Sequence, residues 1–281
     1  MTVSDDDLAA KLAGEAGRRL IELRAARGGD AKALRDAGDR LSHEFLTGEL
    51  ARLRPGDAVL SEEGADDPAR LSANRVWIVD PLDGTREFGE PGRTDWAVHV
   101  ALWADGELTA GAVGLPAQDT VLSTAALKSA GLPARPRTGA GDAASASTPQ
   151  DGGLPLRLLV SRTRPPEFMT DLAASLDAVL VPMGSAGAKA AAVISGQADA
   201  YIHSGGQYEW DSAAPVAVAR AAGLHASRID GSDLRYNQAH PSVPDILICP
   251  IELAPTLLSA INRSRSAQPA GLTEPGRTTT Q

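Results

Sequence analysis

The stretch from residue 75 to residue 88 constrains the fold of this chain more than any other part of the sequence. Residues 76–79 form an uninterrupted apolar run, which is typical of a strand buried on both faces. Pro81 has no N–H group to donate to a sheet, so we expect this strand to stop at Asp80. Asp83 follows after one tight turn. The sequence therefore predicts two carboxylates close together at the end of a buried strand.

Asp80 and Asp83 indicate a divalent cation and a phosphate as ligands. Two converging carboxylates repel each other and are a poor way to stabilise a fold. A hard cation neutralises them and bridges to phosphate oxygens, and Gly84 and Thr85 supply backbone amides and a hydroxyl directly after Asp83. One aspartate at a strand end is more often structural than catalytic, so this assignment depends on further acidic residues.

Two further acidic blocks complete the pattern. Residues 59–64, Val-Leu-Ser-Glu-Glu-Gly, predict a short apolar strand that ends in the paired acids Glu62 and Glu63. Residues 209–215, Glu-Trp-Asp-Ser-Ala-Ala-Pro, place Asp211 at the start of an alanine-rich helix. Acids from three separate blocks are therefore candidates for one metal site.

The three blocks resemble the inositol monophosphatase-like family of magnesium-dependent, lithium-sensitive phosphatases. Its members carry a glutamate after a first strand, then Asp-Pro-(Ile/Leu)-Asp-Gly-Thr, then Trp-Asp-x-Ala-Ala far downstream, and this chain has all three in that order. The forms Leu-Asp-Gly-Thr-Arg-Glu-Phe and Ser-Glu-Glu are most similar to the CysQ-type 3′(2′),5′-bisphosphate nucleotidases. The resemblance extends from about residue 5 to about residue 262, and three independent blocks are unlikely to match it by chance.

The resemblance implies an α/β fold, the layered sandwich of the sugar phosphatases, with two or three Mg²⁺ ions. It implies that Glu62, Asp80 and the carbonyl oxygen of Leu82 hold one ion. It also implies that Asp80, Asp83 and Asp211 hold a second. Like charges raise one another's pKa, so we expect this cluster to need cations. The bound ions bridge the phosphate, activate the attacking water and stabilise the leaving oxygen.

The resemblance also assigns the catalytic and phosphate-binding groups. Thr85, backed by Glu62, orients the attacking water and helps to deprotonate it. Asp83 and the amides of Gly84 and Thr85 contact the phosphate. Displacement is direct and in line, without a phosphoenzyme, so neither histidine nor cysteine is required. The five histidines lie outside the three blocks, and we expect them to be ordinary residues.

Asp39 has two interpretations. It is either a helix cap beside Asp36 or the family's aspartate near the start of the second helix, which serves the second metal and catalysis. The usual Pro-Val-Thr approach to that aspartate is absent here. Both interpretations place Asp39 at a helix start.

Substrate contacts are expected from five residues of the second half of the chain. Ser161-Arg162 is similar to a serine-led turn that nucleotide-directed relatives use near the base and second phosphate; the alternative is a solvated strand end. Ser185 and Lys189 lie at a helix start that suits an anion, although Lys189 is equally consistent with a surface lysine. The relatives' pattern is Gly-Ser-Ser-Leu-Lys, and here the lysine is shifted by one position. Glu209 is a candidate contact for a ribose or polyol hydroxyl.

Composition limits the choice of partner and compartment. A net charge of −9 over 281 residues argues against a nucleic acid polymer or an anionic membrane, but not against a small phosphorylated substrate in a metal-containing site. The single cysteine, Cys249, excludes an internal disulfide. We found no signal peptide pattern or apolar stretch of transmembrane length, so we expect a cytoplasmic protein. The resemblance implies a homodimer.

Four segments are expected along the chain. Residues 1–132 carry two helices and an antiparallel sheet, residues 133–153 form a flexible loop, residues 154–262 alternate strands with helices, and residues 263–281 are a disordered tail. The expected strands are 59–61, 76–80, 96–103, 108–115, 120–124, 156–160, 179–181, 199–203 and 246–249. The expected helices are 5–27, 39–54, 165–176, 186–195, 210–223 and 255–261.

The preferred substrate by resemblance is adenosine 3′,5′-bisphosphate, with a role in sulfate assimilation. Inositol 1-phosphate and fructose 1,6-bisphosphate are the alternative substrates. A regulatory protein that binds a phosphorylated ligand without turnover is the non-enzymatic alternative. The presence of Glu62, Thr85 and Asp211 argues against that alternative, because a binder does not need to activate water.

Overall fold

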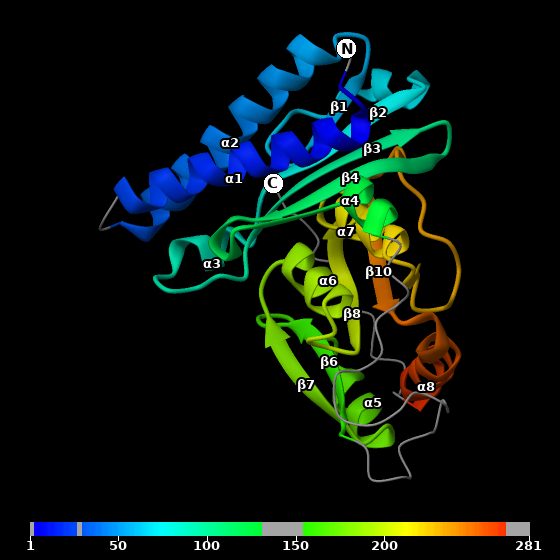
Figure 1. Cartoon of the computed structure of the whole chain (residues 1–281). Helices are drawn as coiled ribbons and strands as arrows, with labels where there is room; N and C mark the ends of the chain where they lie inside the picture. The colour runs from blue at the N-terminus through cyan, green and yellow to red at the C-terminus, as the bar shows by residue number, and fades with distance from the viewer. Residues whose placement is uncertain (1–2, 27–29, 131–153, 268–281) are drawn as a thin grey trace, which may run out of the picture.

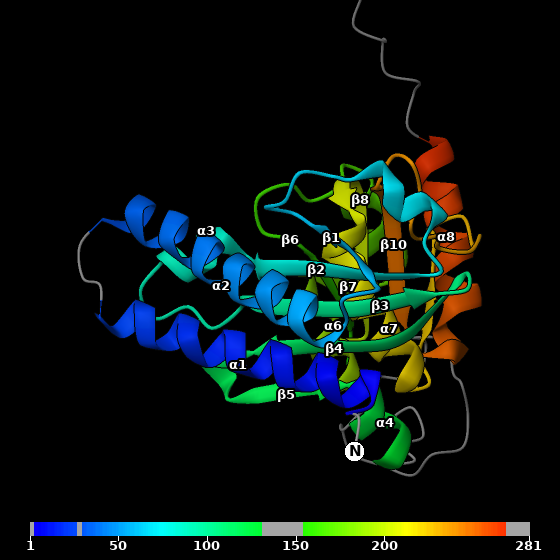
Figure 2. The ribbon, with the colours of Figure 1, turned by 90° about the horizontal axis from the view of Figure 1, so that it is seen from above.

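Two long helices cover one face of the first sheet (Figures 1 and 2). The computed structural model describes residues 3–26, 30–130 and 154–267. Helices α1 (Asp5–Ala26) and α2 (Ala31–Leu53) pack on the first sheet through apolar side chains spaced along their inner faces. Leu8, Leu12 and Leu20 are almost completely buried there.

The first sheet has the strand order β1-β2-β3-β4-β5. Strand β1 (Ala58–Ser61) pairs in parallel with β2 (Arg75–Asp83), and β3 (Ala97–Ala104), β4 (Glu107–Leu115) and β5 (Thr120–Ser123) complete an antiparallel meander. The predicted meander is confirmed. Short helices follow β2 and β5, namely α3 (Thr85–Gly89) and α4 (Thr124–Ala130), and 3₁₀ turns lie at Pro68–Ser72 and Pro116–Gln118.

The second sheet has the strand order β7-β6-β8-β10-β9. Strand β6 (Leu156–Ser161) is parallel to β7 (Ala178–Met183) and to β8 (Ala200–Tyr208), and β10 (Ser242–Cys249) is antiparallel to β8. The short strand β9 (His225–Ser227) was not predicted, because three residues carry no readable period.

Helices α6 (Ala186–Ile194) and α7 (Glu209–Ala221) lie between the two sheets. Their small side chains share one core with apolar residues of both sheets. Helices α5 (Met169–Ser175) and α8 (Ala254–Ala267) cover the other face of the second sheet, after the 3₁₀ turn Ile251–Leu253 in the case of α8. Helix, sheet, helix, sheet and helix layers therefore alternate, as the predicted layered sandwich requires (Figure 1).

Two predictions near the acidic blocks are wrong. Helix α2 begins at Ala31, where Asp30 caps it by accepting a hydrogen bond from the Lys32 amide, so Asp39 lies inside the helix and is not a cap. Strand β2 continues through Pro81 to Asp83. A register irregularity between Asp80 and Asp83 accommodates the missing proline N–H.

Two helix boundaries of the second half also differ from the prediction. Helix α5 begins at Met169 and not at Pro165-Pro166, since a residue before proline avoids the helical conformation. Helix α8 continues to Ala267 through the start of the predicted tail, and Ser264 is buried against the body of the protein. The predicted loop 133–153 lies outside the described residues. No described helix is both long and apolar enough to span a membrane.

Candidate active site

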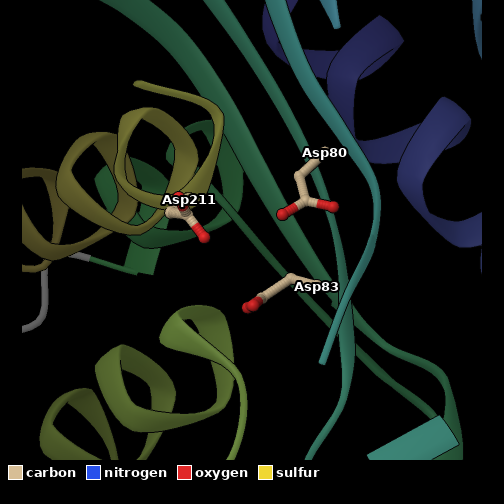
Figure 3. A group of neighbouring side chains, drawn as sticks. All are labelled: Asp80, Asp83 and Asp211. Atoms are coloured by element: carbon tan, nitrogen blue, oxygen red, sulfur yellow. The ribbon is translucent and has the colours of Figure 1, made fainter. Parts of the chain in front are cut away.

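Three aspartates from two distant parts of the chain converge. Asp80 and Asp83 come from β2, and Asp211 comes from the first turn of α7. Each offers a carboxylate oxygen such that the three oxygens lie within 4.8 Å of one another. Figure 3 shows Asp80 and Asp83 projecting from one strand toward Asp211 on the facing helix. Asp80 and Asp83 are only 1% and 7% exposed, so their charges are largely shielded from water.

Local backbone geometry fixes the three carboxylates. The bulge in β2 lets the Leu82 amide donate to Asp80 Oδ1 at 3.0 Å, and the Tyr208 amide donates to Asp211 Oδ2 at 2.7 Å. Gly84 then turns the chain into α3 with a φ of 84°, a left-handed conformation that favours glycine. A Cβ atom there would also lie 3.2 Å from the Asp95 carbonyl oxygen. These bonds predefine the site before any ligand binds.

The acids of this site are too close together for all of them to remain ionised without a cation. Burial raises the pKa of Asp80 well above its usual range, and the neighbouring carboxylates add to the effect. Burial and the charge of Asp83 raise the pKa of Asp211 to about 6. Glu62 follows β1 and is exposed as a residue, yet desolvation of its carboxylate and the charge of Asp211 raise its pKa to about 7. A group of desolvated oxygen donors with this charge fits a hard divalent cation.

Asp83 is the exception, because the protein itself neutralises part of its charge. Its Oδ2 accepts hydrogen bonds from Ser185 Oγ at 2.5 Å and the Gly187 amide at 2.8 Å, and His99 Nε2 lies 3.0 Å away. Burial alone would raise the pKa of Asp83, but His99, Lys189 and the Ser185 hydroxyl together outweigh it and the pKa is lowered. Asp83 therefore stays ionised, and its Oδ1 faces no such donors in the described part of the chain.

His99 contradicts the expectation that the histidines are ordinary residues. It is fully buried in β3 and also lies 3.1 Å from the Trp210 carbonyl oxygen through Nδ1. Gly187 has to be a glycine at this point, because a Cβ atom there would lie 2.3 Å from His99 Nε2. No motif marks His99 in the sequence, since its contact with Asp83 depends on the pairing of β3 with β2.

Thr85 contacts Asp39. The Thr85 hydroxyl lies 2.9 Å from the Leu82 carbonyl oxygen and 3.3 Å from Asp39 Oδ1, and it can donate to either one. Burial and the charge of Glu63 raise the pKa of Asp39 to about 7. No hydrogen bond joins Thr85 to Glu62 within the described residues, so the acid beside this hydroxyl is Asp39 and not the predicted partner.

Three side chains that were predicted to contact substrate form hydrogen bonds within the protein instead. The Lys189 ammonium is buried and donates to the carbonyl oxygens of Gly184 and Ser185 at 2.9 and 2.8 Å, so Lys189 is not a surface lysine. Glu209 is completely buried, and its two oxygens accept hydrogen bonds from the amides of Asn237 and Gln238 at 2.7 and 2.8 Å. Ser185 is bound to Asp83, as described above.

Ser161 and Arg162 lie at the end of β6, as predicted. The Ser161 hydroxyl accepts a hydrogen bond from the Arg164 amide at 3.2 Å. The Arg162 guanidinium donates to Glu87 at 2.9 Å through Nε and to both oxygens of Glu90 at 2.7 and 3.0 Å. Arg162 therefore joins the second sheet to helix α3, which carries Thr85.

Buried carboxylates that fit a divalent cation, beside a hydroxyl and the N-terminal amides of a short helix, define the class of metal-dependent phosphate-ester hydrolases. Comparison with known proteins agrees with this class. The model of the inositol monophosphatase family matches residues 5–266. This chain belongs to that family.

Named relatives give the assignment more detail. The chain is 50% identical over 271 residues to the 3′-phosphoadenosine 5′-phosphate phosphatase of Mycobacterium leprae, covering 92% of this chain and 94% of that protein. It is 34% identical to inositol-1-monophosphatase SuhB of Mycobacterium tuberculosis, with 76% of each chain covered. The structure of CysQ from Bacteroides thetaiotaomicron superposes with a TM-score of 0.67 at 26% identity and covers 86% of this chain and 96% of that one. The protein is a phosphoric monoester hydrolase.

Proposed function

We propose that this protein hydrolyses the 3′-phosphate of adenosine 3′,5′-bisphosphate and releases AMP and phosphate. The main observation in support is the cluster of Asp80, Asp83 and Asp211, whose oxygens lie within 4.8 Å of one another. The half-identical relative from Mycobacterium leprae is named for this substrate, 3′-phosphoadenosine 5′-phosphate. Together they support the reaction class and the preferred ester.

We further propose that the acids of the site hold two or three Mg²⁺ ions. The donors would be Glu62, Asp80, Asp83, Asp211 and the carbonyl oxygen of Leu82. Bound Mg²⁺ would supply charge neutralisation at the phosphate and a water of lowered pKa. Support comes from Asp80, whose pKa is raised well above its usual range by burial and by the neighbouring carboxylates.

The residues around the cluster would carry the proton and hold the phosphate. Thr85 would orient the attacking water and pass its proton to Asp39, whose pKa near 7 lets it accept a proton at neutral pH. Gly84 is the N-cap of α3 and Thr85 is its first residue, and the amides of both would hold phosphate oxygens. The water would displace the alcohol directly and in line, without a covalent phosphoenzyme.

A second candidate substrate is inositol 1-phosphate, because the chain is 34% identical to an inositol-1-monophosphatase over 76% of its length. Fructose 1,6-bisphosphate is a third. A homodimer in the cytoplasm that serves sulfate assimilation follows from the family resemblance and is part of the proposal.

Phosphate release with Mg²⁺ tests the proposal. The assay compares adenosine 3′,5′-bisphosphate, inositol 1-phosphate and fructose 1,6-bisphosphate, each with and without lithium. We expect a large preference for the nucleotide in kcat/KM. Equal rates on all three would indicate a broad phosphatase, and no release from any would favour a protein that only binds phosphorylated ligands.

A further inference from the structure

His99 is a buried histidine that contacts both of the elements that carry the three aspartates. It pairs with Asp80 across β2 and β3, so the two side chains lie on the same face of the first sheet. Its Nε2 lies 3.0 Å from Asp83 Oδ2, and its Nδ1 lies 3.1 Å from the carbonyl oxygen of Trp210, the residue before Asp211. The residue is 0% exposed, so bulk water does not compete for either contact.

Hydrogen-bond chemistry determines what each ring nitrogen of His99 does. A carbonyl oxygen only accepts, so Nδ1 carries a proton and donates to Trp210. An Nε2 without a proton would turn a lone pair toward the Asp83 carboxylate, so Nε2 carries a proton as well. Within the described residues Nε2 has no hydrogen-bond partner other than this ionic contact. The ring therefore presents an N–H group at both ends, one to β2 and one to α7.

The Oδ2 atom of Asp83 faces three donors. Besides His99 Nε2, they are the Ser185 hydroxyl at 2.5 Å and the Gly187 amide at 2.8 Å. A carboxylate oxygen has about two lone-pair sites, so three donors leave none of them free. A cation at the acidic cluster can therefore bind Asp83 only through the other oxygen, Oδ1.

The turn before α6 holds these donors in place. Ser185 has a φ of 43°, in the left-handed region that L side chains rarely adopt. The Lys189 ammonium donates to the Ser185 carbonyl oxygen at 2.8 Å and stabilises this conformation. A Cβ atom on Gly187 would lie 2.3 Å from His99 Nε2, so the helix packs directly against the imidazole ring. These contacts oppose rotation of the Asp83 carboxylate.

A carboxylate that offers one oxygen suits Mg²⁺ better than Ca²⁺. Mg²⁺ requires near-octahedral geometry with ligands at about 2.0–2.1 Å. Ca²⁺ takes about six to eight oxygen ligands in flexible geometry, and a carboxylate often supplies two of them. If Asp83 were free to rotate, it would offer both oxygens to Ca²⁺. With Oδ2 occupied by protein donors, it offers only one.

We infer that His99 is a positioning residue that limits Asp83 to one metal-binding oxygen and thereby makes the site select Mg²⁺ over Ca²⁺. His99 acts through Asp83 and not by contact with the cation or the substrate. The inference rests on the metal site of the proposed function and is independent of which phosphate ester the protein prefers.

Two substitutions separate the two ends of the ring. The amide nitrogen of asparagine lies near the position of Nδ1, and that of glutamine lies near the position of Nε2. His99→Asn therefore keeps the donor for Trp210 and removes the donor for Asp83, whereas His99→Gln does the reverse. Both variants lose the charge of the ring. Because Mg²⁺ and Ca²⁺ have the same charge, the ratio of their dissociation constants reports the geometry of the ligands and not this loss.

Melting temperatures of the metal-free protein at increasing Mg²⁺ or Ca²⁺ concentration give both dissociation constants. In His99→Asn we expect the preference for Mg²⁺ to fall about tenfold, as for other groups that orient a metal ligand. In His99→Gln we expect it to stay within about twofold of wild type. Ser185→Ala removes another donor from the same oxygen and should shift the preference in the same direction as His99→Asn. His225→Asn is the matched control, because His225 lies on β9 and contacts the Ser227 hydroxyl, and it should leave the preference unchanged.

A purely structural role of His99 would destabilise both metal-free variants and weaken the binding of both ions alike. Equal shifts of the ratio in His99→Asn and His99→Gln, or no shift in either, would therefore overturn the inference and leave the phosphatase reaction in place. If neither ion raises the melting temperature of the wild type, the proposed metal site is wrong and the inference fails with it. If His99→Asn does not fold, Ser185→Ala decides, and an unchanged ratio in that variant overturns the inference.

Discussion

The two sheets contribute to the active site in opposite ways. From the first sheet come Asp80 and, after β1, Glu62, whose pKa values are raised by burial and by the neighbouring carboxylates. From the second sheet and its helices come Lys189 and Glu209, whose polar atoms are bound to backbone groups. Both sets of residues are polar, but backbone groups satisfy the second set, whereas the carboxylates of the first set repel one another.

This difference separates residues that act on a ligand from residues that hold the site together. Asp83 combines both behaviours, because Ser185 and Gly187 from helix α6 occupy one of its oxygens. The second sheet thus orients an acid that the first sheet supplies. We expect substitutions in the first set to remove activity and substitutions in the second set to reduce stability.

The largest effect is expected for Asp80→Asn. Loss of this ligand should lower kcat/KM at least about 1,000-fold, since bound metal supplies several kcal/mol of transition-state stabilisation. The same change should raise the melting temperature of the metal-free protein by about 2–4 °C for each kcal/mol of repulsion removed. Kinetics with Mg²⁺ and calorimetry in EDTA measure the two effects. A variant that stays active, or that is less stable in EDTA, contradicts the assignment of Asp80.

The next effect is expected for Thr85→Ala, at about 100-fold in kcat with little change in KM, because the hydroxyl acts on the proton of the water. Thr85→Ser keeps the hydroxyl and is the matched control. If Asp39 works through Thr85, the double variant with Asp39→Asn should be no slower than the slower single variant. If the reductions in kcat of the two single variants multiply in the double variant, Asp39 and Thr85 act separately.

Local motifs made the acids of the proposed metal site predictable. Asp80, Asp83, Glu62 and Asp211 each lie beside an apolar run or an alanine-rich helix start, so the sequence alone places them at element ends. Most strands and their order in the meander were predictable for the same reason. Asp39 was singled out by resemblance although its helix was placed wrongly, because Asp30 and not Asp39 supplies the cap.

Contacts made across elements were not predictable. His99 meets Asp83 only because β3 pairs with β2 and α6 packs above them. The acceptor for Lys189 is the backbone of its own helix start, and the donors for Glu209 are the amides of residues 237 and 238. No hydrophobic period or sequence motif predicts which buried polar side chain will form a hydrogen bond within the fold. The substrate contacts of Ser161, Arg162, Ser185, Lys189 and Glu209 stay predictions.

A smaller effect, on the stability of the metal-free protein, is expected when the pH is changed. The pKa of Asp211 rises from 3.8 to about 6 and that of Glu62 from 4.5 to about 7 in the folded protein. The folded state therefore binds more protons than the unfolded state, and stability in EDTA should fall as the pH rises from about 4 to about 7. Melting temperatures between pH 5 and pH 8 measure the slope, which Mg²⁺ should largely abolish. Glu62→Gln should flatten it, and an unchanged slope would remove Glu62 from the cluster.

The smallest effect on activity is expected for Glu209→Gln. Its two oxygens accept two amide N–H groups, so a glutamine keeps one acceptor and turns an NH₂ group toward the other donor. The free energy of unfolding should fall by about 1–3 kcal/mol, while KM for the bisphosphate changes less than about threefold. Thermal unfolding and steady-state kinetics on the same samples distinguish a structural role of Glu209 from a contact with substrate. A tenfold rise in KM at an unchanged melting temperature would show that Glu209 binds substrate, and the division between the two sets of residues would then no longer follow the two sheets.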